Sequence, residues 1–189
     1  MVNWKNTENT YGLLAIVLHW VTAVGVIFLF SLGLWMDGLD YYDEYYRLAP
    51  HIHKSIGVLL ISLVFFRLIW RLANKQPSSL PSHKNWEKIS AKLTHGAFYA
   101  LLICMLFSGY LITTAKGDSL WVFNWFALPA TISGIANLED YAGSIHKWIA
   151  YSLIGLALVH AAAALKHHFF DKDTTLLRML GREKNTNSH

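Results

Sequence analysis

Residues 144–165 read SIHKWIAYSLIGLALVHAAAAL and contain two histidines, His146 and His160, fourteen residues apart. An α-helix turns about 100° per residue, so fourteen residues bring the second side chain to within roughly 40° of the first. The same fourteen residues rise about 21 Å, which is most of the ~30 Å hydrocarbon thickness of a bilayer. A single helix over this segment therefore presents two imidazoles on one side, one toward each membrane surface.

The composition of the 189-residue chain is typical of a membrane protein. It is 54% hydrophobic and 15% charged, whereas about a quarter of the residues of a soluble domain are charged. The length suits one compact membrane unit, so we predict a single domain over residues 1–189. The lone Cys104 excludes an intramolecular disulfide and a CxxC motif. The basic residues flank apolar segments, which argues against a nucleic-acid partner and favours a membrane lipid environment.

Four apolar segments are long enough to cross a bilayer as helices, with predicted bounds 11–35, 53–72, 93–114 and 144–165. Open strands and loops cannot satisfy their backbone hydrogen bonds in lipid, so we predict an all-α integral membrane four-helix bundle. An amphipathic helix on the inner membrane surface is expected at 174–181. The aromatic segment 119–129, SLWVFNWFALP, is expected to lie along the outer surface.

The lysines and arginines are distributed unevenly between the two sides of this predicted bundle. Twelve of the sixteen fall in the N-terminal segment, around the middle loop or in the C-terminal tail. The positive-inside rule then places both termini in the cytoplasm. The first apolar segment is too long for the core of a cleavable signal, so none is expected.

The histidines of the predicted helices pair by depth. His19 and His160 both lie roughly 8–12 Å below the inner surface, and His53 and His146 both lie at the outer ends of their helices. Imidazole is a usual axial ligand of haem iron, so each pair could hold one haem. A single membrane histidine could equally serve as an interhelical hydrogen-bond donor, but four that pair by depth favour the haem interpretation. His95, at about the inner depth, is the alternative ligand there, but helix packing or a polar wall near the inner haem is favoured for it.

Several other side chains are candidates for binding or catalysis. Arg67 and Arg71 lie at the inner-haem depth, and Lys54 and Lys147 directly follow the outer ligands, so all four could contact haem propionates. They could instead set the topology and extend to the interface.

Two further observations concern positions beside the predicted ligands. Gly57, four residues after His53, leaves room for a flat macrocycle. His167 shares a helix face with His160 and could hydrogen-bond a quinone carbonyl and transfer protons, or serve as an interfacial anchor. His83, in the middle loop, is assigned no role.

Several motifs resemble the bacterial cytochrome b561 family over nearly the whole chain. They are LAIVLHW around His19, HKSIG from His53, LTHGAFYALL around His95, and HAAAALKHHFFDKDTTLLRML from His160. The resemblance implies a four-helix protein of the bacterial inner membrane with two haems b. It also implies iron ligand pairs at His19 with His160 and at His53 with His146. Relatives of this type oxidise superoxide at the outer face and reduce ubiquinone near the inner haem, with the position of His167 at the quinone.

Three functions are compatible with these observations. The first is a superoxide:quinone oxidoreductase that moves electrons from an outer donor through two haems to ubiquinone. The second is a cytochrome b subunit of a hydrogenase or dehydrogenase complex, with the same haem ligands and no substrate of its own. The third is a transporter whose histidines bind a transition metal. The four predicted spans contain no Asp or Glu, which disfavours the transporter.

Overall fold

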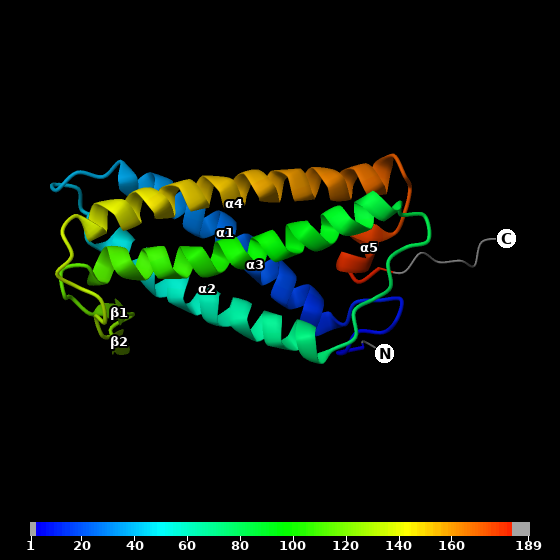
Figure 1. Cartoon of the computed structure of the whole chain (residues 1–189), viewed down its shortest axis with the longest axis horizontal. Coiled ribbons are helices and arrows are strands. Elements are labelled where there is room, and N and C mark those ends of the chain that lie inside the picture. The colour runs from blue at the N-terminus through cyan, green and yellow to red at the C-terminus, as the bar shows by residue number, and fades with distance from the viewer. Residues whose placement is uncertain (1–2, 183–189) are drawn as a thin grey trace. The chain divides into compact units, whose positions relative to one another are not determined.

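The computed structural model describes residues 3–182 and contains four long helices. The elements are α1 (Leu13–Asp37), α2 (Leu48–Ala73), α3 (Asn85–Thr114), β1 (Leu120–Val122), β2 (Phe126–Leu128), α4 (Leu138–Phe169) and α5 (Thr175–Met179) (Figure 1). Each of the four long helices is apolar and long enough to cross a membrane. The predicted helical membrane fold is therefore confirmed, with one short hairpin added.

Large apolar side chains on these helices remain exposed. Ile27 on α1 is 58% exposed and Leu158 on α4 is 68% exposed. A soluble protein rarely exposes apolar patches of this kind, whereas lipid tails would cover them in a bilayer. This exposure agrees with the membrane-spanning length of the helices.

Three helices extend beyond the apolar segments that predicted them. The α2 helix begins at Leu48 and has Pro50 in its first turn. Proline is tolerated there because the N–H groups of the first turn have no hydrogen-bond partner within the helix. The α3 helix begins at Asn85, where the Glu87 carboxylate accepts a hydrogen bond of 2.8 Å from the Lys84 backbone N–H. The α4 helix runs to Phe169 and carries basic residues in its last turn. Hydropathy identifies only the apolar turns, whereas capping and the helix dipole stabilise the polar turns beyond them.

The chain divides into two compact units, and each long helix contributes to both. The terminal unit comprises described residues 3–22, 63–97 and 155–182, and the central unit comprises residues 23–62 and 98–154. Each unit contains one of the predicted histidine pairs.

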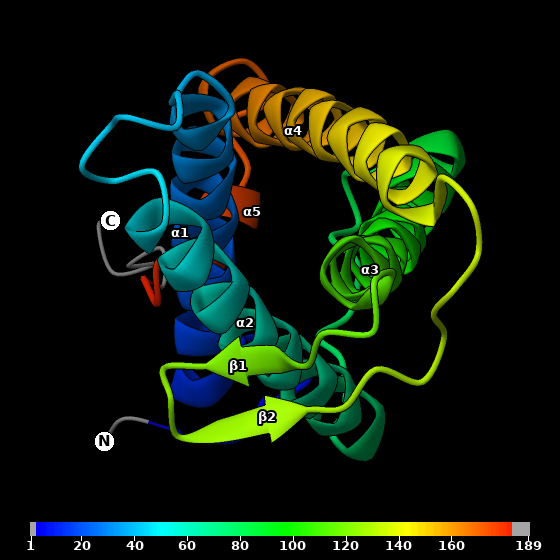
Figure 2. The same cartoon turned by 90° about the vertical axis from the view of Figure 1, so that its left-hand side faces the viewer.

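In the central unit, the aromatic segment after α3 forms an antiparallel hairpin, which composition had not indicated. Leu120 pairs with Leu128 and Val122 with Phe126. The three-residue loop between the strands places Phe123 and Asn124 at φ of 46° and 59°, and the Trp125 N–H donates to the Val122 carbonyl at 2.9 Å, which closes a left-handed β-turn. The backbone N–H of Phe123 donates to Ser55 Oγ at 3.0 Å, which attaches the hairpin to α2 (Figure 2).

In the terminal unit, the short helix α5 is tied to two other segments. Trp20 Nε1 on α1 donates to the carbonyl of Met179 at 2.8 Å, and Arg178 Nη1 donates to the carbonyl of Ser78 at 2.9 Å. The α5 helix has five residues and is therefore shorter than the predicted 174–181. It ends early because Gly181 adopts a left-handed φ of 68°, which terminates a helix.

Candidate functional site

The central unit brings His53 of α2 opposite His146 of α4. Their ring centroids lie 6.3 Å apart, the ring planes are inclined by 68°, and both residues are partly buried. A metal–imidazole bond is about 2.0 Å long, so one ion between two opposed rings would separate their centroids by roughly 6 Å. The observed spacing therefore suits a single metal ion held between the two rings.

Ser108 of α3 orients the His146 ring. Its hydroxyl lies 3.0 Å from His146 Nδ1 and donates to the carbonyl of Cys104 at 2.9 Å. Because the hydroxyl proton is directed to that carbonyl, the serine oxygen accepts the Nδ1 proton of His146. This arrangement leaves the Nε2 lone pair of His146 available for a metal, which is the usual role of a residue behind a ligand histidine. Sequence reasoning missed Ser108, since a serine in an apolar helix gives no specific signal.

Two glycines allow helix backbones to approach these rings closely. A Cβ at Gly109 would lie 3.1 Å from His146 Cε1, and one at Gly33 would lie 3.4 Å from His53 Cε1. Neither was singled out from the sequence, although isolated glycines in an apolar helix often mark such close approaches. A Cβ at Gly57 would meet no atom within 4 Å, in agreement with the room expected beside His53.

His53 and the two lysines predicted to contact haem propionates at the outer site, Lys54 and Lys147, differ in their hydrogen-bond and ion-pair partners. His53 Nδ1 is buried and makes no hydrogen bond to any described residue. Lys147 Nζ lies 2.8 Å from the carboxylate of Asp37, and both side chains are exposed. Within residues 3–182, Lys54 has no ion pair. An exposed ion pair such as Lys147–Asp37 is worth little, so it would not prevent Lys147 from contacting another anion.

The terminal unit brings three imidazoles together. His19 of α1 and His160 of α4 have ring centroids 6.4 Å apart, with planes inclined by 66°. His95 of α3 lies closer to His160, with centroids 5.6 Å apart. The predicted pair is thus adjacent in space, and the alternative ligand His95 is adjacent as well.

Arg67 of α2 reaches the His19 ring. Its Nη2 lies 2.9 Å from His19 Nδ1. A guanidinium can only donate, so Nδ1 is the acceptor and the proton of neutral His19 resides on Nε2. An iron ligand needs an unprotonated ring nitrogen, so holding a metal at His19 requires Arg67 to release Nδ1. Arg71 follows one helical turn later on α2.

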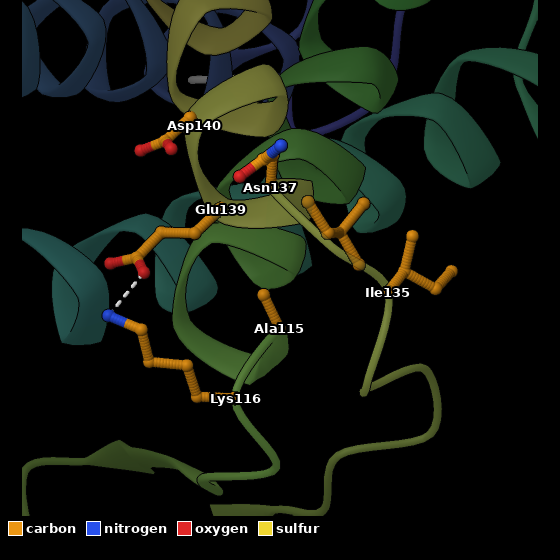
Figure 3. A pocket seen from close by; sticks show the side chains of 7 residues that line it. Ala115, Lys116, Ile135, Asn137, Glu139 and Asp140 are labelled. Carbon is orange, nitrogen blue, oxygen red and sulfur yellow. Dashed lines mark ion pairs between the residues drawn. The ribbon is translucent and has the colours of Figure 1, made fainter.

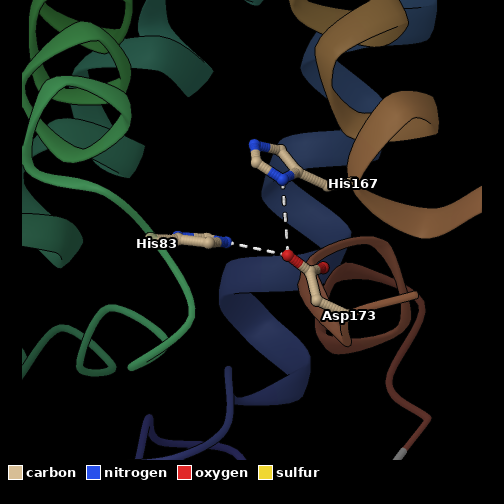
Figure 4. Close-up of side chains that lie close together, drawn as sticks. All are labelled: His83, His167 and Asp173. Atoms are coloured by element: carbon tan, nitrogen blue, oxygen red, sulfur yellow. Dashed lines mark hydrogen bonds and ion pairs between the residues drawn. The ribbon is translucent and has the colours of Figure 1, made fainter. Parts of the chain in front are cut away.

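His167, at the end of α4, faces a polar cluster of the terminal unit (Figure 4). Its Nδ1 lies 2.7 Å from Asp171 Oδ2 and 3.4 Å from Asp173 Oδ2, and His83 Nε2 lies 2.9 Å from the same Asp173 oxygen. Burial alone would raise the pKa of Asp173, but hydrogen bonds from Thr175 and His83 lower it overall. The hydrogen bond from Lys166 is the main cause that lowers the pKa of Asp171.

A separate cavity of about 310 Å³ lies in the central unit between the end of α3 and the start of α4 (Figure 3). Lys116 forms an ion pair with Glu139 beside it, and this hydrogen bond raises the pKa of Lys116. The lining side chains include no histidine or cysteine, so the cavity offers no ligand set for a haem iron.

The sequence profile of prokaryotic cytochrome b561 matches residues 10–182. The chain belongs to the prokaryotic cytochrome b561 family. It is 44% identical to cytochrome b561 homolog 2 of Escherichia coli K12 over 181 residues, which is 96% of either chain. It is 30% identical to cytochrome b561 homolog 1 of the same organism, over 93% of this chain and 99% of the relative. It is 29% identical to the probable superoxide oxidase CybB of Yersinia pestis, over 92% of this chain and 97% of the relative.

Family membership establishes the general class of this protein. It is a multi-pass membrane cytochrome of electron transport that binds b-type haem. The opposed imidazoles fit such a group, because their ring spacings match two axial nitrogen ligands. The buried and unpaired His53 Nδ1, and the glycines against the rings, add further support.

Proposed function

We propose that this cytochrome carries electrons across the bacterial inner membrane through two haems b. His53 and His146 would hold one haem, and His19 and His160 the other. The observation that supports this most directly is that each unit brings together a predicted histidine pair, with ring centroids 6.3 Å apart in one and 6.4 Å in the other. A haem held by two imidazoles supplies a one-electron Fe(III)/Fe(II) couple, and the protein sets its potential.

His19, rather than His95, is the proposed partner of His160. The 6.4 Å spacing of His19 and His160 accommodates two metal–nitrogen bonds of about 2.0 Å. The spacing of His19 and His160 also nearly equals the 6.3 Å of His53 and His146, whereas the ring centroids of His95 and His160 are 5.6 Å apart. His95 then forms part of the polar wall beside the inner site.

The basic residues have a supporting role in this proposal. If Arg67 releases His19 Nδ1, its guanidinium would be free to donate to a haem propionate, because a carboxylate is a suitable bidentate partner for arginine. Arg71 would assist at the inner site, and Lys54 and Lys147 at the outer site. These cations offset the propionate charges and keep the haem oriented.

We further propose that superoxide is the outer electron donor and ubiquinone the acceptor. Two superoxide anions would each lose one electron and leave as O₂. One ubiquinone would take both electrons and two protons to form ubiquinol. His167, near the inner site, would hydrogen-bond a quinone carbonyl and deliver a proton to it. The similarity to the probable superoxide oxidase of Yersinia pestis supports the choice of donor.

The charge distribution supports an orientation with both termini in the cytoplasm. Twelve of the sixteen lysines and arginines fall in the N-terminal segment, around the middle loop or in the C-terminal tail. In this orientation His53 and His146 lie toward the periplasm, and His167 lies on the proton-supplying cytoplasmic side.

Rapid mixing of the purified, oxidised protein with superoxide tests the donor assignment. We expect fast growth of the reduced b-type haem absorption, followed by reoxidation when a ubiquinone analogue is present. Dithionite reduction of the same sample is the control for intact haem. If dithionite reduces the haems but superoxide does not, the protein is an electron carrier for another donor, such as a hydrogenase or dehydrogenase partner.

A further inference from the structure

The polar cluster around His167 includes three side chains of types that bind metals, one from the middle loop and two that lie six residues apart near the end of α4. His83 lies in the loop before α3, His167 in the last turn of α4, and Asp173 in the turn before α5 (Figure 4). One ligand atom from each of the three lies within 4.8 Å of the others. All three belong to the terminal unit.

The donor distances are near those of a metal centre. Bonds of about 2.0 Å in tetrahedral geometry separate neighbouring donor atoms by roughly 3.3 Å. His83 Nε2 and Asp173 Oδ2 are 2.9 Å apart, and His167 Nδ1 and the same oxygen are 3.4 Å apart. Small side-chain rotations would therefore bring all three atoms onto one ion.

The side chains are sheltered and held in place. The side chains of His83, His167 and Asp173 are 17%, 14% and 6% exposed. The other carboxylate oxygen of Asp173 accepts a 2.8 Å hydrogen bond from the Thr175 backbone N–H, which fixes the carboxylate as a partner behind a metal ligand would. The Thr175 hydroxyl also lies 3.2 Å from His83 Nε2.

The ion pairs around the cluster leave the Asp173 carboxylate available to bind a cation. Lys166 Nζ lies 2.7 Å from Asp171 and 3.2 Å from Glu87 and so engages both of those carboxylates. Among residues 3–182, Asp173 has histidines and no lysine or arginine as ion-pair partners. His167 Nδ1 is buried and makes no well-aligned hydrogen bond within the described chain, although two carboxylates lie nearby.

The cluster also borders a cavity of about 240 Å³. His83, Glu87, Asp171 and Asp173 are among its lining residues. A cavity of this size leaves room for water or another small ligand at the remaining position of a three-ligand centre.

We propose that His83, His167 and Asp173 form a binding site for a divalent first-row transition-metal ion. Two imidazoles and one carboxylate suit zinc and ferrous iron better than calcium or magnesium, which prefer oxygen ligands. The site shares His167 with the proposed quinone site, but it does not rest on that function, because metal binding is measured without turnover.

Calorimetric titration of the haem-loaded protein with zinc chloride tests the site. The protein should carry no histidine tag and should first be treated with a chelator. We expect saturable binding of one zinc ion per chain in the native sequence. Because His83→Ala and Asp173→Asn each remove a ligand, each should weaken binding at least about tenfold. The His51→Ala variant is the matched control, since it removes a histidine of the central unit, and it should bind as the native protein does.

The haem absorption spectrum of each variant shows whether it remains folded. A folded His83→Ala/Asp173→Asn double variant that binds zinc as tightly as the native protein would overturn the proposal. Absence of saturable binding to the folded native protein would overturn it as well. Either result would leave the haem and quinone assignments untouched, since superoxide-dependent haem reduction is assayed separately.

Discussion

A histidine that binds haem iron must present an unprotonated ring nitrogen, and the partner of its other nitrogen decides which one is free. The four candidate ligands differ in this respect. The Ser108 oxygen accepts a hydrogen bond from His146 Nδ1–H and leaves Nε2 free. Arg67 donates to His19 Nδ1 and keeps that nitrogen engaged until the guanidinium moves. The outer site therefore already contains a histidine with a free ring nitrogen, whereas His19 of the inner site can bind iron only after Arg67 moves.

Replacing one ligand of each proposed pair separates the two haems. His160→Ala should lose the inner haem and His53→Ala the outer one, because each removes one axial bond. Pyridine haemochrome quantification should show about half the native haem in either variant. A potentiometric titration should show that each variant loses a different one of the two haem redox transitions. Loss of the same component from both variants would contradict the pairing.

Ser108→Ala should shift the potential of the outer haem upward. Without the serine oxygen, His146 loses one acceptor and keeps only its hydrogen bond to the Met105 carbonyl, so the imidazole becomes a weaker electron donor and the ferric state is stabilised less. A change of roughly tens of millivolts is expected for such an outer hydrogen bond. Ser152→Ala is the matched control, because the Ser152 hydroxyl on α4 has the Trp148 carbonyl as its only hydrogen-bond partner within residues 3–182. An equal shift in both variants would argue against a specific effect on His146.

At the scale of elements, α4 contributes a ligand to each proposed haem site and then continues to the His167 cluster. The chain folds back in the turn that follows α4. The N–H groups of Phe170 and Asp171 both donate to the Lys166 carbonyl, and the N–H group of Asp173 donates to the His167 carbonyl. Lys172 takes φ of 51° in this turn. The turn thereby brings Asp173 to His167 and positions α5 against Trp20.

Acid should loosen this turn through Asp173. Its pKa is lowered in the folded protein, so its contribution to stability is fully present above the ordinary carboxyl value of about 4. That contribution is lost as the pH falls through the lowered folded pKa. Hydrogen exchange of residues 175–179, corrected for the intrinsic pH dependence, should therefore rise below about pH 4 in the native protein. Asp173→Asn should be less protected near neutral pH and should lack this acid transition.

At the scale of the whole molecule, the apolar helix surfaces and the asymmetric charges predict how the chain is oriented in a membrane. The four long helices meet the length requirement for spanning. The basic residues concentrate near the termini and the middle loop, which predicts that these segments face the cytoplasm.

Labelling of single cysteines tests this orientation. In a Cys104→Ser background, Ser79→Cys lies in the middle loop and Ser119→Cys in the loop after α3. A membrane-impermeant maleimide should label Ser119→Cys in intact cells after outer-membrane permeabilisation. It should label Ser79→Cys only in inverted inner-membrane vesicles. The reverse pattern would place the termini outside.

By itself, the amino-acid sequence determined the four spans, the helical fold and the candidate histidines. Hydropathy and the helical repeat are local properties, and an imidazole within an apolar segment is conspicuous. The hairpin at 120–128 escaped prediction because its turn depends on the backbone at Phe123 and Asn124. Only the tertiary structure decided that Ser108 serves His146, that Arg67 reaches His19, and that His83 meets Asp173 across ninety residues. Such contacts join residues that are far apart in the sequence and depend on how the helices pack against one another. The hydropathy and helical periodicity of a single segment therefore do not reveal them.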